Sequence, residues 1–133
     1  MISDDQKSLV VYRLEKSVQT LIDAGQLYKS ESFGSSVNRI YYALFYAVSA
    51  LLLCRGLSTS KHTGIKSFLH KEFIKTGVIE HRWGAFYTEM FNNRQEGDYE
   101  DFVSFEKKDV ERWLTLADEF IKVLKQSIER YLT

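Results

Sequence analysis

The chain has 133 residues, of which 44% are hydrophobic and 27% are charged, and its 18 basic and 18 acidic residues balance to a net charge of zero. This length suits one domain, residues 1–133, with a core of its own, and the composition excludes disordered and fibrous proteins. Zero net charge argues against a general nucleic-acid coat protein, while the single cysteine, Cys54, excludes an internal disulfide and favours a reducing, cytoplasmic location.

Two long helices are predicted in the N-terminal half, because apolar residues recur there at helical spacing. The first covers about residues 4–28, with Ser3 or Asp4 as its cap. The second covers about residues 35–55 and is apolar nearly all round, so we expect it to be the central helix of the fold. Its uncharged run is short for a bilayer, and the N-terminus does not resemble a signal peptide, so we expect no membrane partner.

Three further helices are predicted after a polar loop at residues 57–64, LSTSKHTG. The third should stop at Gly77, the fourth should cover about residues 80–94 and end by Gly97, and the fifth should be capped by Ser104. Strand-like alternation is not sustained anywhere. The predicted fold class is therefore all-α, an up-and-down bundle of four to five antiparallel helices.

Charge is unevenly distributed along this neutral chain. Residues 35–82 hold seven basic and two acidic residues, whereas residues 83–112 hold eight acidic and four basic residues. This pattern is typical of solvated helix faces, but it is also expected of a local basic surface for a phosphate-bearing partner.

The histidines do not have the spacing of a metal site. His62, His70 and His81 are too far apart for a pair on one helical turn, and the chain has neither an HExxH motif nor paired cysteines. We expect no metal and no cofactor, and we expect Cys54 to be a small core residue.

Arg94 stands where the apolar face of the fourth helix would continue. Phe86, Met90 and Arg94 follow one another at steps of four residues, which places the guanidinium at the rim of the core. A cation there needs an anion. Either Asp98 forms a structural clamp with it, or Arg94 faces a cleft and binds phosphate with Asp98 and Tyr99 beside it.

Four more residues are candidates for binding a nucleotide or RNA. Asn38 and Arg39 are polar residues at the start of an otherwise apolar helix, one turn before a cluster of tyrosines. Lys61 and His62 lie in the polar loop, where a histidine more often packs or caps than binds a ligand.

Three segments together resemble the HEPN superfamily, the higher eukaryotes and prokaryotes nucleotide-binding domain. They are NRIYYALFYAVSALLLCRGL, SKHTGIKSFLHKEFIKTG and NNRQEGDYEDF, in this order, and the similarity extends over essentially the whole chain. The likeness is to the small stand-alone prokaryotic branch. It implies a helical bundle that forms a homodimer and is often paired with a minimal nucleotidyltransferase as a toxin–antitoxin system.

The resemblance also implies a metal-independent ribonuclease, whose signature is an arginine followed after four to six residues by a histidine. Arg94 matches the arginine, but the positions five to seven residues later are Tyr99, Glu100 and Asp101. Arg94 could stabilise charge on the phosphate. Asp98 and Tyr99 are poor bases unless their pKa values are shifted, and His62 could replace the missing histidine if the fold brings its loop close.

Three hypotheses follow. The protein is a toxin-type ribonuclease subunit with a variant active site, or a non-catalytic module that binds a nucleotide or a nucleotidyltransferase, or a structural dimer without a small ligand. In the second case Tyr99 could accept a nucleotidyl group from the partner.

Overall fold

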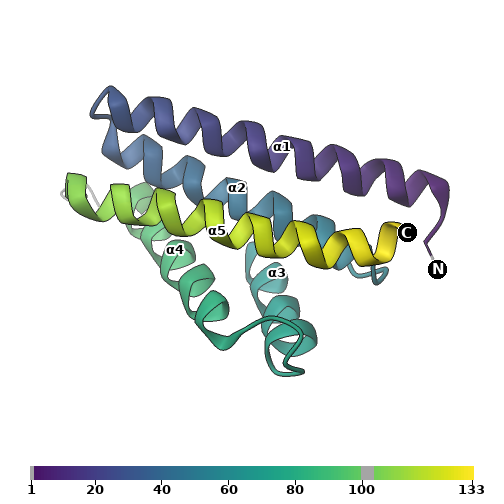
Figure 1. The fold of residues 1–133 in the computed structure, drawn as a ribbon. Coiled ribbons are helices and arrows are strands. Elements are labelled where there is room, and N and C mark those ends of the chain that lie inside the picture. Colours follow the sequence, from purple (N-terminus) through teal and green to yellow (C-terminus); the bar gives the residue numbers. More distant parts are fainter. Residues whose placement is uncertain (1, 100–103) are drawn as a thin grey trace.

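The computed structural model describes the backbone of residues 2–99 and 104–133, and all side chains in that part except those of residues 95–99. The described residues form five α-helices and one π-helical turn, without a strand (Figure 1). The elements are α1 (Asp4–Lys29), α2 (Phe33–Leu53), α3 (His62–Leu69), η1 (His70–Ile74), α4 (His81–Tyr99) and α5 (Lys107–Leu132). The predicted all-α bundle is confirmed.

The first two helices form a long antiparallel hairpin. Helix α1 begins with a capping box, in which the Ser3 hydroxyl accepts a hydrogen bond from the Gln6 amide and the Gln6 side chain accepts one from the Ser3 amide. Two buried hydroxyls then join the helices. Ser17 donates to the carbonyl of Ala43 at 2.6 Å, and Ser36 donates to that of Ala24 at 2.8 Å. These bonds satisfy buried polar groups and fix the register of the hairpin.

Helix α2 is the centre of the molecule, as its apolar sequence predicted. It packs against α1, α3, α4 and α5, and 13 of its 21 residues are buried. The helix is long and apolar enough to cross a membrane by length and composition, but 72% of its most apolar window is buried inside the fold. Burial of this kind is typical of the core helix of a helical bundle.

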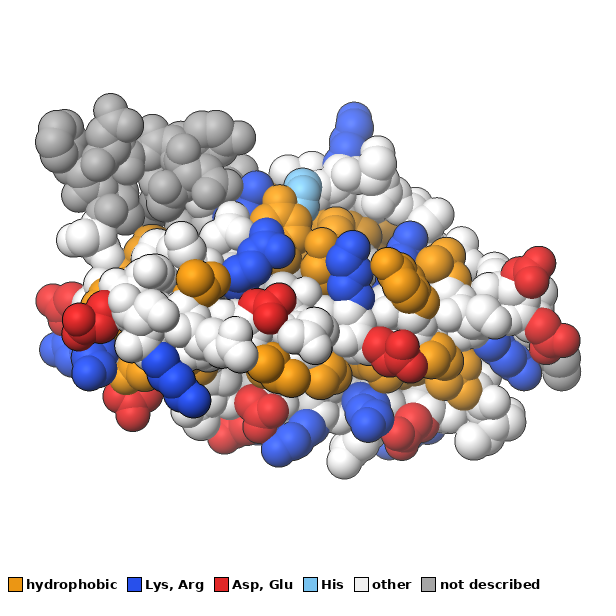
Figure 2. Space-filling model, turned by 90° about the horizontal axis from the view of Figure 1, so that it is seen from above, with side chains coloured by type: hydrophobic (Ala, Val, Ile, Leu, Met, Phe, Trp, Pro, Cys, Tyr) orange, Lys and Arg blue, Asp and Glu red, His pale blue; other side chains and the backbone are white. Residues whose placement is uncertain are grey.

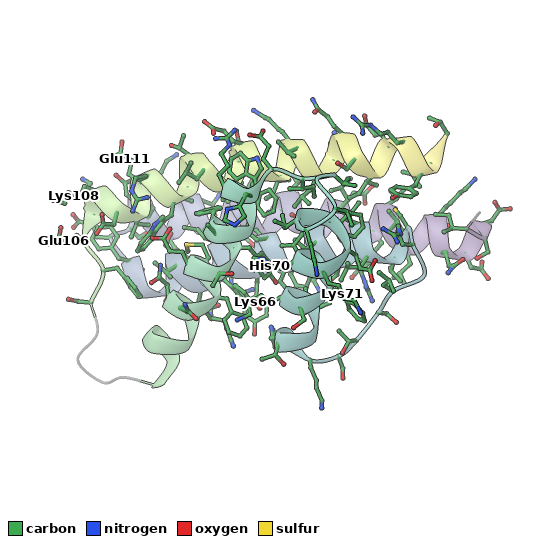
Figure 3. All side chains as sticks on the ribbon, turned by 90° about the horizontal axis from the view of Figure 1, so that it is seen from below. Lys66, His70, Lys71, Glu106, Lys108 and Glu111 are labelled. Carbon is green, nitrogen blue, oxygen red and sulfur yellow. The ribbon has the colours of Figure 1, made fainter. Side chains whose placement is uncertain are left out.

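The segment of α3, η1 and α4 forms a shorter, tilted hairpin on one side of α2 (Figure 1). Figure 3 labels Lys66, His70 and Lys71 on this hairpin, and Glu106, Lys108 and Glu111 near the start of α5. Gly84 lets α4 approach η1 closely, because a Cβ atom there would lie 2.9 Å from a ring carbon of His70 and 3.0 Å from Ile74. The hairpin thereby holds the start of α3 and the middle of α4 against α2.

Helix α5 returns along the bundle and packs against α1 and α2 (Figure 1). One face of it is buried, as its long apolar stripe predicted. The Trp83 ring of α4 stacks on Phe120 of α5, with ring centroids 5.1 Å apart and planes within 3°. The N-terminus and the C-terminus lie at the same end of the bundle (Figure 1).

Several predicted element ends are wrong. The loop expected at residues 57–64 ends earlier, because His62 is already the first residue of α3. Helix α4 continues through Gly97 to Tyr99, since an interior glycine weakens a helix without ending it. The cap of α5 is Glu106, rather than Ser104.

Candidate functional site

His62 packs against the middle of α2, on a wall of aromatic side chains. Its Nδ1 atom lies 2.8 Å from the Tyr41 hydroxyl, within hydrogen-bond distance. The imidazole centroid is 4.5 Å from the ring centroid of Phe45 and 5.6 Å from that of Tyr42. Because Phe45 lies three residues after Tyr42 and four after Tyr41 in α2, the three residues present neighbouring rings to the start of α3. We call Tyr41, Tyr42 and Phe45 the aromatic wall.

Arg94 contacts the same aromatic wall from α4. Its guanidinium carbon lies 5.1 Å from the ring centroid of Tyr41 and 6.0 Å from that of Tyr42, which is the range of a cation–π interaction. The side chain is partly buried, as expected for a residue at the rim of the core. The fold therefore brings Arg94 and His62, which are distant in the sequence, to one set of rings.

The electrostatics of this site keep both His62 and Tyr41 uncharged near neutral pH. Burial, followed by the nearby charge of Arg94, lowers the pKa of His62 below its ordinary value. Burial raises the pKa of Tyr41 to about 12, although Arg94 acts in the opposite direction. A neutral imidazole can accept a proton at one nitrogen and donate one at the other, so His62 can serve in proton transfer.

Asn38 and Arg39 join this site at the start of α2. The Nε and Nη2 atoms of Arg39 donate hydrogen bonds to the Asn38 Oδ1 atom at 3.1 and 2.8 Å. The Arg39 guanidinium carbon also lies 4.8 Å from the ring centroid of Tyr42, which Arg94 contacts as well. Two cations thus lie on one ring, and a phosphate near Tyr42 would meet positive charge from both α2 and α4.

The remaining predicted site residues are Lys61, Asp98 and Tyr99. Lys61 is exposed and precedes α3, and its backbone amide donates to the Thr59 hydroxyl at 3.2 Å. Asp98 and Tyr99 belong to the last turn of α4, one turn beyond Arg94. Their side chains lie outside the described part of the chain, so both remain predictions from the sequence.

The part played by the aromatic wall was not predicted from the sequence. Tyr41 is fully buried, as a core tyrosine should be, and yet its hydroxyl reaches His62. Lys66 was also missed, and its Nζ atom lies 4.3 Å from the ring centroid of Phe91, the residue one turn before Arg94. The one sequence signal for this wall was the cluster of tyrosines one turn after Asn38 and Arg39. Tyrosines on an apolar helix are expected both in a buried core and in a binding site, so the cluster alone could not distinguish the two.

Cys54 is a buried core residue, as predicted, and burial raises the pKa of its thiol to about 11. Such a thiol is a poor nucleophile near neutral pH. Within the described residues, no group of three or more His, Cys, Asp or Glu side chains is placed to hold a metal ion.

Comparison with known proteins identifies the family. Residues 10–127 match the model of the HEPN domain. A UPF0332 protein of Thermotoga maritima is 43% identical over 126 residues, which cover 95% of this chain and 96% of the relative. The protein named "Putative toxin MJ0142" of Methanocaldococcus jannaschii is 34% identical over 113 residues, covering 85% of this chain and 77% of the relative. The protein named "Putative toxin MJ0605" of the same organism is 27% identical over 134 residues, covering 95% and 99% of the two chains. The chain therefore belongs to the HEPN domain family.

Proposed function

We propose that this HEPN protein is a toxin-type subunit that cuts RNA without a metal ion, and that Arg94 and His62 act on the substrate. The observation that carries the proposal is their common position on the aromatic wall. The family signature places its histidine shortly after the arginine, where this chain has none. His62 brings an imidazole to the aromatic wall that Arg94 contacts, from a different element.

The proposed reaction uses the 2′-hydroxyl of the RNA as the nucleophile. His62 takes the proton of that hydroxyl, and the 2′-oxygen bonds to the adjacent phosphorus. The bond from phosphorus to the 5′-oxygen breaks, and the leaving oxygen takes a proton from water. Arg94 stabilises the negative charge that develops on the phosphate oxygens. The product is a 2′,3′-cyclic phosphate and a free 5′-hydroxyl.

The low pKa of His62 suits this role. At neutral pH the imidazole is neutral, because burial and Arg94 disfavour its charged form, and only the neutral ring can accept a proton. When substrate phosphate neutralises part of the Arg94 charge, the imidazolium becomes easier to form. In the tautomer that this role requires, Nδ1 carries the ring proton and donates it to the Tyr41 hydroxyl oxygen, so that the unprotonated Nε2 is left for the substrate.

A partner completes the proposal. Two relatives carry names that call them putative toxins, and the resemblance to stand-alone HEPN proteins implies a minimal nucleotidyltransferase as the antitoxin. We propose the same pairing here, in the cytoplasm, with the HEPN chain as a homodimer.

The product ends test the ribonuclease directly. Purified protein is incubated with a single-stranded RNA oligonucleotide in excess EDTA, and the fragments are analysed by mass spectrometry. We expect 2′,3′-cyclic phosphate ends, and we expect His62→Gln to lower the rate by about 10²–10⁴-fold. His81→Gln, which removes an exposed histidine at the start of α4, is the control. Intact RNA, or equal rates for both variants, would refute the assignment.

The second candidate is a non-catalytic module that binds a nucleotide or its nucleotidyltransferase partner, and the absence of a histidine at the signature position favours it. Tyr99 would then be the residue that receives a nucleotidyl group. Intact-mass measurement after incubation with the partner and ATP tests this reading. A mass increase in wild type that is absent from Tyr99→Phe supports it, and an unchanged wild-type mass rejects it.

A further inference from the structure

A cleft lies between α1, the C-terminal half of α2 and the loop that follows α2. It consists of two adjoining cavities of about 320 and 270 Å³, which share the residues Arg13, Ser49, Thr59 and Ser60. Its other lining residues are Tyr12, Lys16, Phe45, Tyr46, Leu57, Ser58 and Ile65. The lining thus combines two cations, several hydroxyl groups and aromatic rings, and it includes no carboxylate. We call this the α1–α2 cleft.

The two cations of the cleft are available to an anion. Arg13 and Lys16 lie one turn apart on α1, so both heads reach the same side of the helix. Neither forms an ion pair with a carboxylate in the described part of the chain. Lys16 instead holds its ammonium group 4.7 Å from the ring centroid of Tyr46. Figure 2, which views the molecule from the α1 side, shows Lys and Arg side chains beside hydrophobic side chains on this face.

The hydroxyl groups add neutral donors opposite these cations. Ser49 is a buried serine of α2, and it lines both cavities together with Thr59 and Ser60 of the loop. Gly64 lets the first turn of α3 hold this loop, because a Cβ atom there would lie 2.8 Å from the Thr59 side chain. Hydroxyl donors beside Arg and Lys are the groups that bind phosphate oxygens in nucleic-acid complexes.

Aromatic side chains connect the cleft with the candidate active site. Phe45 lines the cleft, and its ring centroid is 4.5 Å from that of His62. Tyr46 also lines the cleft, and its ring centroid is 6.1 Å from that of Tyr42, on which Arg39 and Arg94 lie. From Tyr42 to Ser49 the rise along α2 is about 10 Å, a distance that a short stretch of single-stranded RNA can span.

We propose that the α1–α2 cleft binds a backbone phosphate of single-stranded RNA, next to the nucleotide held at Arg94 and His62. Arg13 and Lys16 contact the phosphate, and Tyr46 and Phe45 pack against the neighbouring base and sugar. A single strand fits this arrangement because its unstacked bases are free to lie on aromatic rings, whereas a duplex keeps them inside. The identity of the ligand rests on the proposed action on RNA, but the binding site is separate from the reacting groups.

Binding of an RNA that cannot be cut tests the cleft apart from catalysis. The probe is a fluorescein-labelled single-stranded RNA whose nucleotides are all 2′-O-methylated, so that the 2′-oxygen cannot attack, and the readout is fluorescence anisotropy. We expect Arg13→Gln and Lys16→Gln each to raise the Kd by about tenfold. Each variant should also reduce the slope of log Kd against log salt concentration by about 0.7. Lys29→Gln is the control, because Lys29 lies on the same helix about 20 Å from Lys16.

The outcomes separate this inference from the ribonuclease proposal. If the Arg13 and Lys16 variants bind like Lys29→Gln while keeping the wild-type melting temperature, the cleft proposal is overturned, even if the wild type cuts RNA. If they bind more weakly and the wild type does not cut RNA, the cleft stands and the ribonuclease proposal falls. Thr59→Val, which keeps the shape of the side chain and removes its hydroxyl, should weaken binding by a smaller factor. Equal binding of a methylated duplex, with the same dependence on Arg13, would overturn the assignment to single strands.

Discussion

At the scale of single residues, the site depends on side chains that combine burial with a polar end. Tyr41 packs in the core and places its hydroxyl on His62, while His62 packs on Phe45 and keeps a nitrogen for other partners. His70 is a parallel case in the neighbouring segment, where its Nε2 lies 3.1 Å from the Thr88 hydroxyl. Partial burial of this kind leaves a signature in the pH dependence of stability.

We predict that the free energy of unfolding falls as the pH drops below about 6.5. Burial lowers the pKa values of His62 and His70 in the folded protein, so the unfolded chain binds more protons in the window between the folded value and the ordinary value of about 6.5. The stability is fully present above that window and is lost as the pH falls through it. Urea unfolding at pH 7.5 and 5.5 measures the effect, above the range in which most carboxylates titrate.

A double variant, His62→Gln with His70→Gln, is the comparison. It should lose less stability than the wild type over the same pH interval, because the two partly buried imidazoles no longer titrate. An equal loss in both proteins would mean that these histidines do not cause the acid sensitivity.

At the scale of elements, the positions of α3 and α4 decide whether the site exists. The Lys75 amide donates a hydrogen bond to the His70 carbonyl at 2.8 Å, and this bond between residues five apart is typical of a π-helical turn. Helix α4 packs on this turn through Gly84. This contact helps to set where the hairpin of α3, η1 and α4 lies on α2, and therefore where Arg94 and His62 lie on the aromatic wall. A side chain at Gly84 should disturb both packing and site.

We predict that Gly84→Ala lowers the free energy of unfolding by about 1–3 kcal/mol, because its Cβ would lie within 3.0 Å of side-chain atoms of His70 and Ile74. Gly25→Ala is the matched control. It also lies inside a helix, no atom within 4 Å would meet its Cβ, and we expect it to stabilise by about 0.5–1 kcal/mol. Urea titrations of both variants give the comparison, and equal effects of the two changes would contradict the close packing at Gly84.

The sequence was a good guide to the elements and a poorer one to their ends. The apolar periodicity of α2 and α5 comes from burial, so it reports helices and their buried faces directly. The position of a helix end depends on smaller free-energy differences than the burial of a whole apolar face does. Gly97 was expected to stop α4, but a glycine costs only about 1 kcal/mol within a helix.

The candidate site was predictable only in part, for the same physical reason. Local spacing placed Arg94 at the rim of the core, because neighbouring turns of one helix determine that position. The hydrogen bond between Tyr41 and His62 joins two elements through tertiary packing, and no spacing within either element indicates it. The sequence therefore indicated His62 as a candidate site residue and the tyrosines of the central helix as core residues. It did not indicate that Tyr41 and His62 are in contact.

At the scale of the whole molecule, α1 carries most of the exposed apolar side chains. Five of the seven large hydrophobic residues that are exposed in the described part of the chain lie on this helix: Leu9, Val11, Tyr12, Val18 and Ile22. Val11, Val18 and Ile22 fall on one side of α1, and Val11 and Val18 line a groove of about 370 Å³ with Lys125 of α5. A second copy of the chain, as proposed for the homodimer, would cover such a surface.

Sedimentation velocity tests the homodimer and its location. We predict a dimer at micromolar concentration, and we predict that Val18→Asp weakens it by at least about tenfold, because an aspartate would be desolvated in the interface. Val78→Asp is matched in residue type and in exposure, 49% against 45% for Val18, and lies in the loop before α4. A wild-type monomer at high concentration would contradict the dimer, and equal behaviour of the two variants would place the interface elsewhere.

In the proposed reaction, Arg94 acts on an RNA phosphate rather than only supporting the fold. This role is tested most directly by the cleavage rate of Arg94→Ala beside wild type, in EDTA, with the melting temperatures of both proteins recorded. We predict that the rate falls by about 10²–10³-fold while the helical bundle stays folded, because the substitution removes the charge that stabilises the phosphate in the transition state. Equal cleavage by the two folded proteins would contradict this role.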